Sequence, residues 1–126
     1  MPFQIRLALI SLFVIGIALV AWFGLFAGFA MPSKPLVWIR NDHLLHVCAF
    51  SWLSLIGLLL WGPAAAVIAL LVVGAGLLEL LQNFFPAHQM SLVDWCVSSG
   101  GVMLGTVLFP IIRYIWLSQR LQIWSK

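Results

Sequence analysis

The chain has 126 residues, of which 64% are hydrophobic and only 7% carry a charge, and its mean hydropathy is +1.17. A soluble domain is about half apolar and about a quarter charged, so this composition excludes a water-soluble fold. Six basic and three acidic residues give a formal net charge of +3, and they are too few and too scattered to form a surface that binds nucleic acid.

The first two apolar stretches are each long enough to cross a membrane. A transmembrane helix needs about 20 apolar residues to span roughly 30 Å of hydrocarbon. The first helix is predicted over residues 7–31, ending before Pro32 and Pro35, and it is too long for the apolar region of a signal peptide, so we expect it to be retained. The second helix is predicted over residues 42–61, with Asn41 as its N-cap.

The remaining apolar residues form two further helices. A Gly-Pro turn at residues 62–63 precedes a helix predicted over residues 64–85, which Pro86 ends. The last helix is predicted over residues 92–117. The sequence therefore predicts an all-α fold, a polytopic transmembrane bundle of about four helices in a single domain, residues 1–126.

Basic residues indicate the orientation of this bundle. Four spans place both termini on one side, and Lys and Arg are enriched in cytoplasmic segments. The terminal side carries Arg6, Arg113, Arg120 and Lys126, and the opposite side carries Lys34 and Arg40. We therefore expect cytoplasmic termini.

The two cysteines, Cys48 and Cys96, lie inside predicted helices. Neither belongs to a CxxC motif or to a Cys/His ligand spacing. We expect both to be buried free thiols.

The three acidic residues are predicted to meet at one end of the bundle. Asp42 starts the second helix, Glu79 lies near the end of the third, and Asp94 lies near the start of the fourth, so antiparallel helices bring them to one membrane face. His46 follows Asp42 by one turn, and Gln82 follows Glu79 by three residues, so each pair shares a helix face. Because an ionisable side chain in the membrane is costly unless it is paired, these residues are expected to face the bundle interior.

The fourth helix carries a stripe of small and polar residues. Ser98, Gly101 and Gly105 follow Asp94 at spacings of four, three and four, and the two glycines form a GxxxG pair that favours close helix packing. With cytoplasmic termini, these polar residues are expected to face the extracytoplasmic side. The predicted ligand-binding cluster comprises Asp42, His46, Glu79, Gln82, Asp94 and Ser98, with His43 and His88 flanking it.

Structural explanations for these residues stay open. Ser91 and Asp94 form a capping-box pattern, in which the Asp94 carboxylate only accepts the Ser91 amide. Asp42 could interact only with the positive end of its helix dipole, and His46 could be a hydrogen-bonded core histidine. Carboxylates and imidazole could bind a metal, but no HExxH-like ligand pair occurs, so no metal and no cofactor is predicted. No nucleophile motif such as GxSxG occurs, so no catalytic residue is assigned.

Three short motifs occur in a fixed order. Residues 42–47 read DHLLHV, residues 79–88 read ELLQNFFPAH, and Asp94 is followed by Ser98 and Gly101. Over residues 40–105 the chain thereby resembles the VanZ-like family of bacterial membrane proteins, whose pattern is Asp-Lys-x-x-His-Phe, then Glu-x-x-Gln-x-Phe-x-Pro-x-Arg, then an Asp with an Asn and a Gly behind it. The positions that depart from this pattern are His43 for Lys, His88 for Arg and Ser98 for Asn.

The resemblance implies a multi-pass protein of the bacterial cytoplasmic membrane and cell envelope. The namesake of the family is associated with low-level resistance to teicoplanin, a lipid-bearing glycopeptide. We therefore expect a non-enzymatic protein that binds a lipid-like or glycopeptide-related molecule, with membrane lipids and an envelope precursor or glycopeptide as partners and with oligomerisation left open. The alternatives are a membrane-embedded enzyme, with Glu79 as general acid or base and His46 as its partner, and a structural subunit of a membrane complex.

Overall fold

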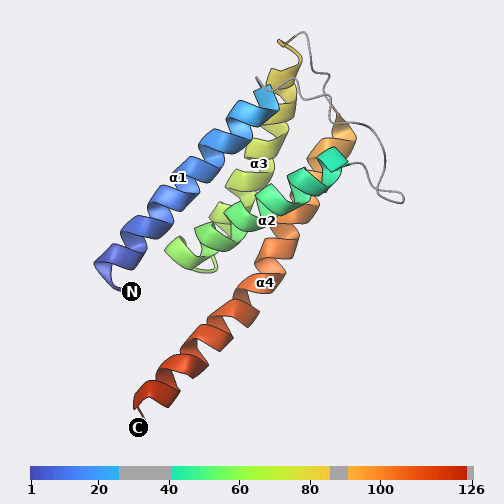
Figure 1. Cartoon of the computed structure of the whole chain (residues 1–126). Coiled ribbons are helices and arrows are strands. Elements are labelled where there is room, and N and C mark those ends of the chain that lie inside the picture. The colour runs from blue at the N-terminus through green and yellow to red at the C-terminus, as the bar shows by residue number, and fades with distance from the viewer. Residues whose placement is uncertain (26–40, 86–90, 125–126) are drawn as a thin grey trace.

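Four helices make up the bundle. The computed structural model describes residues 1–25, 41–85 and 91–124, and over these residues it is helical without strands. The helices, which alternate in direction, are α1 (Phe3–Leu25), α2 (Asn41–Trp61), α3 (Ala65–Gln82) and α4 (Leu92–Trp124) (Figure 1). Each contains a segment long and apolar enough to cross a membrane. The predicted all-α transmembrane bundle is therefore confirmed.

Helix boundaries differ from the predicted ones by one residue at the starts of α2 and α3 and by more at three other places. α1 begins at Phe3 instead of residue 7, and its predicted end at residue 31 lies outside the described residues. α3 ends at Gln82, because the Asn83 amide bonds to the carbonyl of Leu80 at 3.3 Å and so starts a tighter final turn. α4 continues to Trp124, past the predicted end at residue 117, since its last residues are mostly good helix formers.

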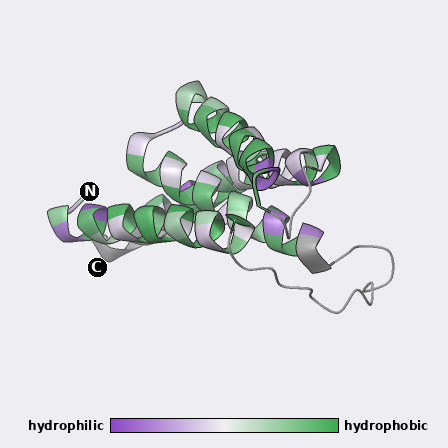
Figure 2. Ribbon diagram, turned by 90° about the horizontal axis from the view of Figure 1, so that it is seen from above, coloured by the Kyte–Doolittle hydropathy of each residue, from purple (hydrophilic) through white to green (hydrophobic). Residues whose placement is uncertain are grey.

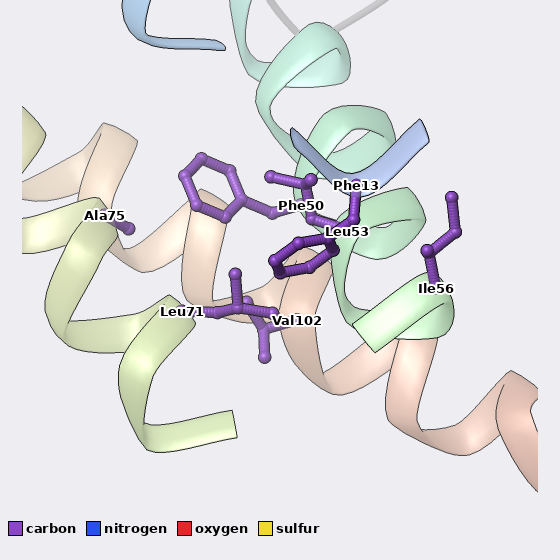
Figure 3. Packing of buried hydrophobic residues seen from close by; sticks show 7 residues of the cluster. All are labelled: Phe13, Phe50, Leu53, Ile56, Leu71, Ala75 and Val102. Carbon is purple, nitrogen blue, oxygen red and sulfur yellow. The ribbon is translucent and has the colours of Figure 1, made fainter. Parts of the chain in front are cut away.

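Buried apolar residues from all four helices form the core. Its members are Phe13, Phe50, Leu53, Ile56, Leu71, Ala75 and Val102 (Figure 3). Phe13 also contacts Trp61 edge to face, with ring centroids 5.1 Å apart. Most other large apolar side chains are exposed. Coloured by hydropathy, the ribbon shows hydrophobic residues along the helices (Figure 2). A bundle with this surface needs a lipid environment.

The closest helix pair is α2 and α4, which have the most extensive contact of any two helices in the described part of the chain. A Cβ atom on Gly101 would lie 2.6 Å from the Val47 carbonyl oxygen, and one on Gly105 would fall onto the Ser51 carbonyl oxygen. Ser51 Oγ donates a hydrogen bond of 2.9 Å to the Gly101 carbonyl. The two backbones can approach this closely only because these positions are glycine.

The expected burial of the cysteines was wrong. Cys48 and Cys96 are free thiols, as expected, but both are exposed on the outside of the bundle. Cys48 directly follows Val47, whose backbone faces α4, so its own side chain points away from that contact. In a membrane protein the lipid-facing surface is as apolar as the core, so an apolar sequence context does not indicate burial.

Both chain termini lie at one end of the bundle (Figure 1). The C-terminal ends of α1 and α3 and the N-terminal ends of α2 and α4 lie at the other end (Figure 1). Gln82 fixes part of this end, because its Nε2 donates a hydrogen bond of 3.0 Å to the carbonyl of Gly24 and thereby ties α3 to α1.

Candidate functional site

Three ionisable residues from three helices converge at the end of the bundle opposite the termini. His46 comes from α2, Glu79 from α3 and Asp94 from α4. One ring nitrogen of His46 and one carboxylate oxygen from each acid all lie within 4.8 Å of one another. We call these three residues the polar cluster.

Glu79 lies at the base of the polar cluster. Its side chain is only 3% exposed, although α3 is otherwise almost entirely apolar. Its Oε2 accepts a hydrogen bond of 3.2 Å from the backbone amide of Ser91, the residue that precedes α4. A carboxylate at this position is stabilised by an unpaired amide and by the positive end of the α4 dipole. Glu79 therefore joins the end of α3 to the start of α4.

The capping-box explanation of Asp94 is only half fulfilled. Ser91 Oγ accepts a hydrogen bond of 3.2 Å from the Asp94 amide, as an N-cap should. The Ser91 amide, however, donates to Glu79 and leaves the Asp94 carboxylate without that capping role. The alternative in which Asp94 only accepts the Ser91 amide is therefore not supported, because a second carboxylate from α3 takes the same donor.

Asp94 Oδ1 is the one buried side-chain oxygen without a hydrogen-bond partner in the described part of the chain. His43 Nε2 lies 3.1 Å from this oxygen, which is an ion-pair distance when the imidazole is protonated, but the contact lacks hydrogen-bond geometry. The side chains of His43 and Asp94 are each 21% exposed, so part of each lies at the surface of the bundle. Burying a carboxylate oxygen without a donor is costly, which indicates that a further group belongs here.

Ser98 positions the histidine. Its side chain is 1% exposed, and its Oγ lies 3.0 Å from His46 Nδ1. This hydrogen bond fixes the orientation of the imidazole ring relative to the two carboxylates. Ser98 reaches His46 because Gly101, one turn further along α4, lets that helix approach α2 so closely.

The other predicted site residues are placed differently. Gln82 is 6% exposed and lies at the same end of the bundle, but its amide nitrogen bonds to α1. Asp42 belongs to α2, but its side chain is outside the described part, and His88 lies in the undescribed residues 86–90. The roles of Asp42 and His88 stay predictions. Sequence reasoning missed the bond from Ser91 to Glu79, since these residues lie on different helices and form no local motif.

The polar cluster is suited to a group that carries positive charge or several hydrogen-bond donors. Two ionised carboxylates within 4.8 Å repel each other unless a cation or a proton lies between them. An ammonium group or a metal ion would satisfy both acids and the buried Asp94 oxygen. Comparisons of the chain with models of protein families, with curated proteins and with solved structures found no match.

Proposed function

We propose that this chain is a multi-pass protein of the bacterial cytoplasmic membrane that binds the cationic group of a lipid-like molecule in the polar cluster. The observation that carries this proposal is the convergence of His46, Glu79 and Asp94 within 4.8 Å at one end of an apolar bundle. Ionisable groups within transmembrane helices are expensive and usually mark a ligand or ion site.

The surroundings of the polar cluster favour an amphiphilic ligand. Leu45, Leu80 and Trp95, the chain neighbours of the three cluster residues, expose 53%, 51% and 38% of their surface on the outside of the bundle. Apolar chains can cover such side chains while a headgroup reaches the carboxylates beside His43 and Asp94. A water-soluble cation would gain nothing from this apolar surface, so a ligand with both parts fits better.

The orientation and the wider role belong to the same proposal. The terminal end of the bundle carries more basic residues than the other end, which supports cytoplasmic termini and an extracytoplasmic polar cluster. There the cluster would meet envelope precursors and lipid-bearing glycopeptides at the membrane surface. The motif resemblance to VanZ-like proteins supports a role in glycopeptide susceptibility and stays a prediction.

A structural role is the second candidate. The Ser91 amide on Glu79 joins α3 to α4, and Gln82 joins α3 to α1. These bonds could be the whole purpose of the polar groups, in which case replacing them would unfold the protein instead of abolishing binding. The two candidates therefore predict different results for a folded variant.

Retention of lipid by the purified protein tests the proposal. We expect the protein to retain phosphatidylethanolamine over phosphatidylglycerol from mixed vesicles, and Glu79→Gln or Asp94→Asn to lower that retention by about 10-fold, since each removes a charge-assisted hydrogen bond. Cys96→Ser, an exposed change two residues from Asp94, is the matched control and should leave retention unchanged.

The same variants separate the alternatives. Folded Glu79→Gln and Asp94→Asn proteins that retain phosphatidylethanolamine like the wild type would refute lipid binding by these carboxylates. Loss of the folded form in both would favour the structural role. A new lipid product that forms with the wild type and not with Glu79→Gln would show an enzyme. Teicoplanin susceptibility of cells producing each variant tests the wider role.

A further inference from the structure

The three members of the polar cluster are all residues that bind metal ions. His46 offers an imidazole nitrogen, and Glu79 and Asp94 offer carboxylate oxygens. We propose that these three side chains bind one divalent transition-metal ion of the zinc class. The inference goes beyond the proposed lipid binding, because a metal can occupy the cluster in the absence of any lipid.

The donor set selects the class of metal. An imidazole nitrogen suits a first-row transition metal such as Zn²⁺, which also accepts carboxylate oxygens, whereas Mg²⁺ and Ca²⁺ prefer oxygen ligands alone. The two carboxylates also neutralise a divalent charge, which matters in an apolar bundle because an unbalanced charge there is costly.

The distances permit coordination after a small adjustment. Bonds to Zn²⁺ of roughly 2.0–2.2 Å place tetrahedral ligand atoms about 3.4 Å apart. The ligand atoms here lie within 4.8 Å of one another, so shifts of the side chains alone bring them into range. A cation at the centre would draw together two carboxylates that otherwise repel each other.

A second observation concerns the Asp94 carboxylate. Asp94 Oδ1 is buried and accepts no hydrogen bond within the described residues, although a buried carboxylate oxygen nearly always has a partner. His43 Nε2 at 3.1 Å supplies a charge contact without hydrogen-bond geometry. A metal ion bound to this oxygen would provide the partner that the protein itself does not.

The outer contacts of the cluster resemble those that orient metal ligands. Ser98 Oγ lies 3.0 Å from His46 Nδ1, and the Ser91 amide donates to Glu79 Oε2 at 3.2 Å. Such hydrogen bonds hold ligating histidines and carboxylates in one orientation and raise metal affinity. Three protein ligands leave a fourth tetrahedral position for water.

Metal titration of the untagged, full-length protein in dodecyl maltoside, without added lipid, tests this proposal. The background is the Cys48→Ser/Cys96→Ser protein, because both thiols are exposed and could bind metal adventitiously. We expect one Zn²⁺ per chain after equilibrium dialysis, and Co²⁺ should give the absorption bands of a tetrahedral site. Glu79→Gln, Asp94→Asn and His46→Gln should each weaken binding by at least about 10-fold.

Two results would overturn the metal site. One is a folded Cys48→Ser/Cys96→Ser protein that takes up no stoichiometric Zn²⁺ and gives no tetrahedral Co²⁺ spectrum. The other is full binding by all three variants. Ser98→Ala should reduce affinity while keeping the Co²⁺ bands, as a positioning residue would.

Failure of the metal proposal can be distinguished from failure of the proposed lipid binding. Zn²⁺ and phosphatidylethanolamine would occupy the same carboxylates, so saturating Zn²⁺ should displace the retained lipid. Zn²⁺ binding without lipid retention would support the metal site and reject the lipid proposal, and lipid retention without Zn²⁺ binding would do the reverse.

Discussion

Replacing Gly101 with alanine should separate α4 from α2. The added Cβ would lie 2.6 Å from the Val47 carbonyl oxygen and 3.0 Å from the Val47 Cα, and ordinary contacts begin at 3.4 Å. Both atoms belong to the backbone of α2, so no side-chain rotation relieves the clash. The neighbouring Gly100 has no atom within 4 Å of its own Cβ position, which makes Gly100→Ala a control with the same chemical change in the same helix.

The expected difference between these two variants is large. An alanine in a helix is more favourable than glycine by about 1 kcal/mol, so Gly100→Ala should be neutral or slightly stabilising. Overpacking typically costs about 1–3 kcal/mol, and more when the obstacle is backbone. Both variants gain this helix propensity, so we expect the free energy of unfolding of Gly101→Ala to lie about 1–3 kcal/mol below that of Gly100→Ala.

Unfolding by sodium dodecyl sulfate in mixed micelles, followed by circular dichroism and tryptophan fluorescence, measures this difference. Because Ser98 lies on the same face of α4, Gly101→Ala should also weaken the contact between Ser98 and His46 and lower binding at the polar cluster. Equal unfolding free energies for the two alanine variants, within about 0.5 kcal/mol, would show that α2 and α4 do not pack through Gly101.

Three further predictions concern the ends of the helices and the direction of the bundle. Ser91→Ala removes the N-cap of α4 and should lower the free energy of unfolding by about 1 kcal/mol in the same assay. Ser118→Ala is the control, because it also removes one side-chain hydrogen bond, but an exposed one, and it should therefore cost less. Gln82→Leu leaves the Gly24 carbonyl without its donor, so amide hydrogen exchange at the end of α1 should accelerate while that of α4 stays constant. In a background without cysteines, an impermeant maleimide added to intact cells should label Asn83→Cys and not Gln4→Cys; the opposite pattern would place the termini outside.

The helices could be predicted because the bilayer constrains them so strongly. Each apolar stretch of the sequence became a helix, since a chain in hydrocarbon must satisfy its backbone groups internally. The ends were less predictable. Pro110 lies inside α4 without ending it, and the helix continues through residues of good helix propensity to Trp124.

The polar cluster could be predicted in part. Antiparallel helices dictate that Glu79 and Asp94 lie at one end of the bundle, and both do. The sequence could not indicate which donor each carboxylate receives, because that depends on how α3 and α4 are rotated about their axes. The sequence analysis considered carboxylates and imidazole as metal ligands but predicted no metal, because the three side chains lie one to a helix and form no local ligand motif.

The distribution of the cluster over α2, α3 and α4 also sets an order of events during biogenesis. Glu79 belongs to α3, whereas the Ser91 amide that donates to its carboxylate follows later in the chain, directly before α4. Until α4 inserts, this side chain has to be kept neutral, hydrated or near the translocon, because an isolated carboxylate is poorly tolerated in lipid. Packing of α4 against α2 is then the step that completes the bundle. A chain arrested before this step would expose the unpaired Glu79 carboxylate of α3, which membrane quality control can recognise.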